Sequence, residues 1–210
     1  MATSTSLELV EAKPQRKPNV TDIIPPVDFS FLRLTNVQEC ETQEPRDISP
    51  RRPHPIKTTV THENGEKKYI SRCLRLNNNK FTDINNLKPL AMSLFDHIGR
   101  IGWIDLSFNL LSTIDPVLTE FTNLAILYLH GNNITELKEV NKLASLKKLW
   151  KLTLHGNDID KIKGYRQYVL STIPTLVNLD FSTVTKGDRV TAGTWQAFNS
   201  AQRSKRISRD

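Results

Sequence analysis

The sequence contains only two cysteines, Cys40 and Cys73, among its 210 residues. Two cysteines provide neither a disulfide framework nor the paired spacing of a zinc knuckle. Disulfides are rare in the reducing environment of the cytosol, and the composition fits that environment. We therefore expect a cytoplasmic protein without disulfides.

Long apolar runs are missing as well. No stretch approaches the roughly 20 apolar residues that a membrane-spanning helix needs, and Met1 to Val10 lacks the basic start and apolar core of a signal peptide. Hydrophobic residues make up 38% of the chain and aromatic residues 7%, which is low for a fully compact globule. Most of the eleven prolines lie before residue 60, so an extended N-terminal part is expected.

Recognisable catalytic motifs are also absent. The chain has no Ser or Cys with an evident paired base, no phosphate-binding loop and no dinucleotide fingerprint. Asp105 and Asp180 are the candidate carboxylate pair, but two intervening strands of the predicted sheet would separate them too far for shared acid–base work. We therefore expect that the protein is not an enzyme and that it binds neither a cofactor nor a small-molecule substrate.

The positive charge is concentrated near the C-terminus. The formal net charge is +7; counting along the sequence gives 10 − 10 = 0 for residues 1–69, 13 − 10 = +3 for 70–184 and 6 − 2 = +4 for 185–210. Such a basic end can attract an acidic polymer or simply keep the chain soluble. Nucleic acid is disfavoured as a partner because basic and aromatic residues do not interleave and no RNA-binding motif is present.

A short apolar pattern recurs between residues 71 and 159. In the copy from Ile101 to Leu111, apolar residues occupy places 1, 4, 6 and 11, and Asn occupies place 9. The same pattern starts at Leu124 and Leu149, and in a degenerate form at Ser71. This spacing is typical of a leucine-rich repeat, in which each unit buries its apolar row against its neighbours.

The repeated asparagine has a structural explanation. The chain turns inward at place 9, which leaves backbone groups away from water, and a side-chain amide can both donate to and accept from them. We interpret this structural ladder as Asn79, Asn109, Asn132 and Asn157. The fold prediction is an α/β solenoid with short parallel strands on its concave face and helices or 3₁₀ turns on its convex face.

Three segments follow from this pattern. Residues 70–184 form the solenoid, residues 1–69 form an extended Pro-rich arm, and residues 185–210 form a C-terminal helix with a basic tail. The arm contains one apolar strip at 27–34, whose apolar members can either cover the open end of the first repeat or dock on a partner. These members are Phe29, Phe31, Leu32 and Leu34.

The outward places of the predicted strands supply a candidate protein-binding surface. Large apolar groups gathered on an exposed face usually mark an interface, and charged neighbours set register and specificity. The alternative is that the arm or the last helix covers this face. The predicted surface consists of Arg75, Trp103, Asp105, Phe108, Ile126, Tyr128, His130, Lys151, Thr153 and His155.

Two histidines fall at the same place in neighbouring repeats. His130 and His155 should stack about 5 Å apart, one strand spacing. A zinc site needs a third ligand, for which Asp105 and Asp180 are the nearest candidates. We expect no metal, because the ligand count is insufficient and His followed by Gly is better explained as part of a turn.

The pattern changes after Ile159. Leu176, Leu179 and Phe181 repeat places 1, 4 and 6, but place 9 is Val184. This ending resembles the C-terminal cap of the leucine-rich repeat subfamily that includes the regulatory subunit of protein phosphatase 1, the spliceosomal leucine-rich protein and axonemal dynein light chain 1. The resemblance implies a cap at 163–184, marked by Tyr165, Arg166, Pro174, Leu179 and Asp180.

A closer resemblance covers about residues 25–195. Trp103-Ile-Asp-Leu-Ser-Phe-Asn and Gly164-Tyr-Arg-Gln-Tyr-Val-Leu are similar to one group of leucine-rich repeat proteins that is associated with ciliated cells and axonemes and has no established catalytic activity. The resemblance implies a non-enzymatic scaffold in a ciliary axonemal assembly, with other axonemal proteins and tubulin as candidate partners and no membrane. A regulatory subunit of an enzyme such as a phosphatase, and a ribonucleoprotein assembly factor, remain the alternatives.

Overall fold

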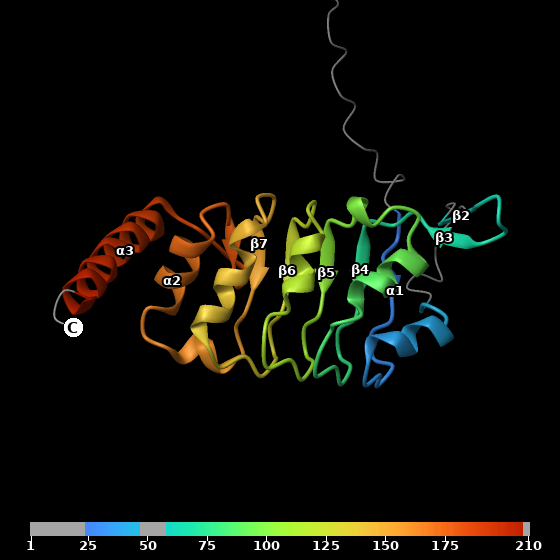
Figure 1. Cartoon of the computed structure of the whole chain (residues 1–210), viewed down its shortest axis with the longest axis horizontal. Coiled ribbons are helices and arrows are strands. Elements are labelled where there is room, and N and C mark those ends of the chain that lie inside the picture. The colour runs from blue at the N-terminus through green and yellow to red at the C-terminus, as the bar shows by residue number, and fades with distance from the viewer. Residues whose placement is uncertain (1–23, 47–57, 208–210) are drawn as a thin grey trace, which may run out of the picture.

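The computed structural model describes residues 24–46 and 58–207, and its central feature is a seven-stranded sheet (Figure 1). Neighbouring strands are parallel except for the last pair, which is antiparallel. In order across the sheet they are β1 (Val27–Asp28), β4 (Cys73–Arg75), β5 (Trp103–Asp105), β6 (Ile126–Tyr128), β7 (Lys151–Thr153), β8 (Asn178–Leu179) and β9 (Ser182–Thr183). The register aligns identical places of successive repeats, so the predicted solenoid is confirmed.

Short helices cover the convex side, which faces the viewer in Figure 1. They alternate with the strands because each coil returns behind the sheet before the next strand begins. They comprise α1 (Leu87–Leu94), α2 (Tyr165–Thr172) and the 3₁₀ helices η3 (Ile98–Arg100), η4 (Pro116–Glu120), η5 (Leu137–Ser145) and η6 (Asp158–Lys161). The core between the two layers is apolar and continuous.

The repeat places explain this core. Ile104 on β5 and Leu106, which directly follows β5, both point inward and are fully buried, as are Leu127 and Leu129 in the next repeat. Leu111, at place 11, returns to the same interior. Each coil thus contributes one apolar row whose burial depends on the coils on either side.

The four recurring asparagines lie inside the turns that follow the strands. The Asn132 side chain accepts a hydrogen bond from Leu111 N at 3.0 Å and donates to Leu106 O and Leu129 O at 3.0 and 2.9 Å. Asn109 and Asn157 bridge their coils in the same way. These amides therefore join each coil to the one before it.

The N-terminal strip is part of the solenoid, which is the first of the two alternatives given for it, while residues 1–23 and 47–57 of the predicted arm lie outside the described residues. β1 pairs with β4, and Phe29 N donates to Arg75 O at 2.8 Å. The Asn79 side chain accepts from Leu32 N and Leu34 N at 3.1 Å each, and donates to Phe29 O at 2.8 Å. The strip therefore caps the first repeat, because Val27 and Phe29 cover its apolar end.

This placement corrects the docking interpretation for two of the four strip residues. Phe29 and Leu34 are buried in the core and cannot reach a partner, whereas Leu32 is half-buried and Phe31 is 60% exposed. The described remainder of the arm is also ordered. It forms the 3₁₀ helix η2 (Val37–Thr42) and a hairpin of β2 (Thr59–Thr61) and β3 (Lys67–Tyr69) that projects from the N-terminal end of the solenoid in Figure 1.

The C-terminal end closes with a helix, α3 (Lys186–Ile207), which packs against α2. Thr185 and Asp188 form a reciprocal capping box, in which Asp188 N donates to Thr185 Oγ1 and Thr185 N donates to Asp188 Oδ2. Trp195 meets the Tyr168 ring at 5.6 Å, whereas Val190 and Phe198 on the same helix are exposed. Within the described residues, no helix has the length and apolar character needed to cross a membrane. Residues 208–210, the end of the predicted basic tail, lie outside the described residues.

Candidate protein-binding surface

An aromatic cluster occupies the middle of the concave face. Tyr128 lies at its centre, with its ring 5.7 Å from that of Trp103 and 5.5 Å from that of Phe181. The Lys151 ammonium lies over both Tyr128 and Phe181, at 5.5 and 5.3 Å from the ring centroids. Cation–π contacts of this kind fix a long, mobile side chain on an aromatic surface.

The sequence pattern missed Phe181, which it assigned to an inward place. β8 and β9 form a hairpin whose two-residue turn, Asp180-Phe181, has φ of 52° and 60°. Both values are those of a type I′ turn, and the turn carries the Phe181 ring out of the core onto the concave face. The ring is 54% exposed and lies 5.6 Å from both His130 and His155.

Phe108 borders this cluster on a strained piece of backbone. Its φ is 52°, in the left-handed region that aromatic residues rarely adopt. Its ring meets His130 edge-on at 5.0 Å and covers Gly131, where a Cβ atom would lie 2.6 Å from Phe108 Cδ1. Gly131 thus leaves room for an aromatic side chain that stays 53% exposed. The same positive φ recurs at Asn78 and Gly131 in the equivalent place of neighbouring coils, so it belongs to the turn of the repeat.

The acidic end of the face lies over β1, β4 and β5. Arg75 Nη1 pairs with Asp28 Oδ2 at 3.2 Å. Asp105 accepts hydrogen bonds from Ser107 N and Ser107 Oγ at 3.1 and 2.6 Å and is buried. Asp105 is therefore committed to its own turn, while the half-buried Arg75 remains within reach of a partner.

The predicted surface residues therefore separate into two groups. Arg75, Trp103, Ile126, Tyr128, Lys151 and His155 are half-buried on the open face, and Phe108 is exposed there. Asp105, His130 and Thr153 are buried, which corrects their predicted direct contact with a partner. Thr153 is covered by His130, because its hydroxyl lies 2.8 Å from His130 Nδ1.

The two histidines stack face to face. Their ring centroids are 4.7 Å apart and their planes differ by 8°, and His155 Nδ1 lies 3.3 Å from Asp180 Oδ1. Among the residues that the structure describes, no group of three His, Cys, Asp or Glu side chains is arranged to hold a metal ion. The pair therefore belongs to the aromatic cluster, within which it connects Phe108 to Phe181.

This stack makes stability depend on pH. Burial, and then the neighbouring His155, lower the pKa of His130 below its ordinary 6.5. The unfolded chain then binds more protons, so the stabilisation is complete above pH of about 6.5 and is lost as pH falls from there through the lower pKa of the folded state. Chemical denaturation between pH of about 7.5 and 5.5 should show this loss. His130→Gln should reduce the loss, whereas the exposed His97→Gln control should retain it; equal slopes in all three would contradict the assignment.

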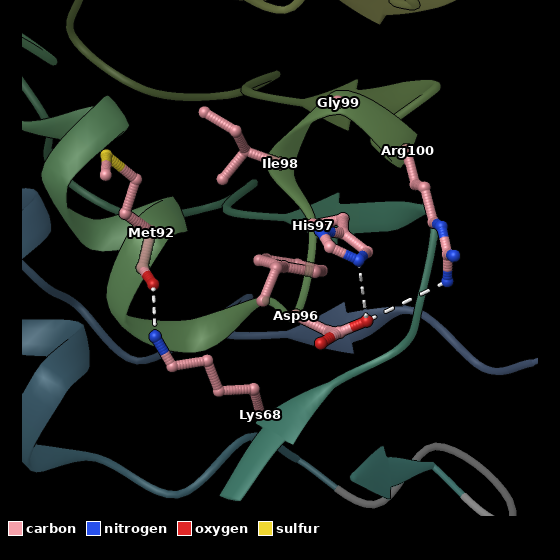
Figure 2. A pocket seen from close by; sticks show the side chains of 8 residues that line it. Lys68, Met92, Asp96, His97, Ile98, Gly99 and Arg100 are labelled. Carbon is pink, nitrogen blue, oxygen red and sulfur yellow. Dashed lines mark hydrogen bonds and ion pairs between the residues drawn. The ribbon is translucent and has the colours of Figure 1, made fainter. Parts of the chain in front are cut away.

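One pocket of about 500 Å³ lies outside this face, between the β2–β3 hairpin and α1 (Figure 2). Lys68 and Arg100 line it, and Lys68 Nζ donates to Met92 O at 3.0 Å. Its carboxylate, Asp96, pairs with His62 at 3.0 Å, His97 at 3.5 Å and Arg100 at 3.8 Å. The His62–Asp96 pair and the Lys68 hydrogen bond hold the hairpin against α1 and the residues that follow it, so these polar groups are engaged in structural contacts.

Comparisons with known proteins agree with the fold. A leucine-rich repeat family model matches residues 79–210. The chain is 48% identical over 183 residues to leucine-rich repeat-containing protein 51 of Bos taurus, covering 87% of this chain and 91% of the relative. The chain belongs to the leucine-rich repeat family, in the group of leucine-rich repeat-containing protein 51.

More distant leucine-rich repeat proteins resemble part of the chain. U2 small nuclear ribonucleoprotein A′ of Arabidopsis thaliana is 30% identical over 128 residues, which cover 60% of this chain and 51% of that protein. The crystal structure of the Drosophila melanogaster SNF/U2A′ complex contains a chain with a TM-score of 0.51 and 25% identity, covering 72% of this chain and 91% of that one. Both similarities support the same repeat architecture.

The leucine-rich repeat cap is held by a polar network around Asp180. The Asp180 carboxylate accepts from Tyr165 Oη at 2.7 Å and from Leu154 N and His155 N at 2.6 and 2.9 Å. Burial, followed by Asp180, raises the pKa of the Tyr165 hydroxyl, so it stays protonated and donates. Asp180 therefore joins the last coil to the one before it through hydrogen bonds that it only accepts.

The other predicted cap residues end and anchor this last coil. Arg166 forms a two-pronged pair with Asp188, with distances of 2.9 and 3.0 Å, and this pair holds the pKa of Asp188 well below its usual range. The pair ties α2 to α3. Leu179 is buried, and Pro174 follows the end of α2, where it prevents the helix from continuing.

Proposed function

We propose that the chain is a non-enzymatic scaffold that binds another protein through the aromatic cluster on its concave face. The observation that carries the proposal is the group formed by Phe108, Tyr128 and Phe181, with Lys151 held over two of its rings. Large aromatic side chains of this kind are the commonest energetic anchors of protein interfaces. None of the described segments of the chain covers them, since Phe108 and Phe181 are both more than half exposed.

The partner proposed is another protein rather than a small molecule. A shallow aromatic face bordered by charged groups, here Arg75 and Lys151, suits a macromolecular surface. The structural relative in the SNF/U2A′ complex is a leucine-rich repeat chain in a complex with a second component, which supports a similar use of the fold here.

A more specific proposal is that the scaffold acts in a ciliary axonemal assembly. Its support is the resemblance noted in the sequence, together with a net charge of +7 that suits an acidic surface such as that of tubulin. Co-pelleting with microtubules should occur at low salt and weaken as salt rises. Failure to pellet at low salt would contradict direct tubulin binding. It would not affect the scaffold proposal, which substitutions in the aromatic cluster test separately.

Ribonucleoprotein assembly is the second candidate, and the specific observation in its favour is the similarity to U2 small nuclear ribonucleoprotein A′. The two candidates predict different partners. Ribonuclease treatment before purification should leave partner recovery unchanged for an axonemal scaffold and should reduce it for a ribonucleoprotein component. If the chain instead regulates an enzyme, an enzyme activity should be recovered together with the purified chain.

The aromatic cluster is tested with a double variant, Tyr128→Ala/Phe181→Ala. Partner recovery from ciliated cells should fall about tenfold or more, because removal of interface anchors typically costs at least 2 kcal/mol. The matched control is Met92→Ala/Ile162→Ala, which removes exposed apolar side chains from outside the cluster. Quantitative mass spectrometry of proteins cross-linked to each variant provides the measurement, and equal recovery with both variants would refute the proposed surface.

A further inference from the structure

A row of cations follows the edge of the sheet at which the strands begin. Arg72 immediately precedes β4, and Arg100 lies three residues before β5. Lys147 and Lys148 lie just before β7. All four side chains are exposed, and we refer to them as the basic edge.

Hydrogen bonds connect this edge from one coil to the next. Arg72 Nε donates to Arg100 O at 3.4 Å, which brings two cationic residues together. Asn123, before β6, donates to Gly99 O and accepts from Lys148 Nζ. The basic edge is therefore connected across successive coils, with the uncharged Asn123 bridging the cations before β5 and β7.

The charge of the basic edge is largely uncompensated. Among the residues that the structure describes, Arg72, Lys147 and Lys148 form no ion pair. Arg100 shares the single carboxylate of Asp96 with two histidines. Like charges held side by side raise the local potential and favour an anionic partner.

An exposed apolar pair ends the row. Trp150, 43% exposed, directly follows the Lys147–Leu149 segment, and its carbonyl accepts from Val177 N at 2.7 Å. Val177 is 54% exposed beside it. Tryptophan and arginine are enriched among the residues that anchor protein interfaces, and here an exposed tryptophan lies beside cations that form no ion pair.

We propose that the basic edge, together with Trp150, binds an extended acidic peptide segment of a partner protein. The row spans β4 to β7, three strand spacings or about 14 Å, which an extended peptide of about four to five residues matches. A single aromatic at one end gives nucleic acid too few stacking positions, since single-stranded binders stack successive bases. This surface is separate from the aromatic cluster and does not depend on the function proposed for it.

The test uses the full chain and a fluorescein-labelled deca-glutamate peptide. Charge reversal in Arg72→Glu/Lys148→Glu should weaken binding about tenfold or more, as measured by fluorescence polarisation at low salt. The neutral variant Arg72→Gln/Lys148→Gln should lose less affinity for the peptide than the charge-reversed variant. Thermal unfolding of each variant establishes that the solenoid is intact.

The matched control is Lys80→Glu/Lys163→Glu, which makes the same change in net charge with exposed lysines away from the basic edge. It should weaken binding by less than about threefold, because only the long-range potential changes. Equal losses in the edge and control variants would overturn the proposal. Tighter, edge-dependent binding of a thymidine decamer than of deca-glutamate would overturn it in favour of nucleic acid.

Discussion

Asn132→Ala should lower the free energy of unfolding by about 3 kcal/mol, because an unsatisfied buried backbone group costs about 1–3 kcal/mol and a small cavity is added. Leu111 N loses its partner outright, since the Asn132 oxygen is what it donates to. Leu106 O and Leu129 O each lose one donor but retain another, from Asn109 and Asn157. The loss is therefore larger than for an ordinary hydrogen bond but smaller than for three orphaned groups.

The adjacent Asn133 supplies the control. Its side chain is exposed, so Asn133→Ala should change stability by less than about 0.5 kcal/mol. Thermal unfolding should show the midpoint of Asn132→Ala lowered by about 6–12 °C and that of the control nearly unchanged. Similar midpoints for both variants would show that the amide ladder does not hold the coils together.

Phe29→Ala should lower the free energy of unfolding by about 3–5 kcal/mol, the usual cost of removing a fully buried phenylalanine. Phe29 is 0% exposed and lies against the first repeat. Its removal opens the end of the solenoid, and terminal caps are required because each repeat is stabilised by its neighbours. The effect should be greatest in β4, where hydrogen exchange should accelerate more than in β7.

Phe31, two residues after Phe29 in the sequence, provides the matched control. Its side chain is 60% exposed and lies 5.5 Å from the Arg46 guanidinium. Phe31→Ala should therefore cost less than about 1 kcal/mol. Comparable losses for Phe29→Ala and Phe31→Ala in chemical denaturation would mean that the strip is not a cap.

The repeat spacing was sufficient to predict the sheet and its register. Places 4 and 6 determine which side chains point inward, so Ile104 and Leu106 could be assigned to the core from the sequence alone.

The N-terminal cap was only half predicted, although its sequence signal was present. Asp28-Phe-Ser-Phe31 matches Asp105-Leu-Ser-Phe108 in sequence and in structure, and both phenylalanines have positive φ.

The candidate surface was harder to predict because turns and neighbours decide it. Phe181 follows the apolar spacing, but the hairpin between β8 and β9 reverses the chain and turns the ring outward. Thr153 follows the outward spacing, yet His130 covers it. Val190 and Phe198 have apolar side chains that suggest packing, but both are exposed, whereas Trp195 contacts Tyr168 of α2. Such outcomes depend on tertiary contacts rather than on local pattern.

Hydrogen exchange of the free chain at Phe29 and Phe31 tests the central claim most directly. The claim is that the solenoid begins at β1 and caps itself, which leaves the concave aromatic cluster open for a partner. The amides of Phe29 and Phe31 donate to Arg75 O and Asn77 O, so they should exchange orders of magnitude more slowly than in an unstructured peptide. Exchange at the rate of an unstructured peptide would contradict the account.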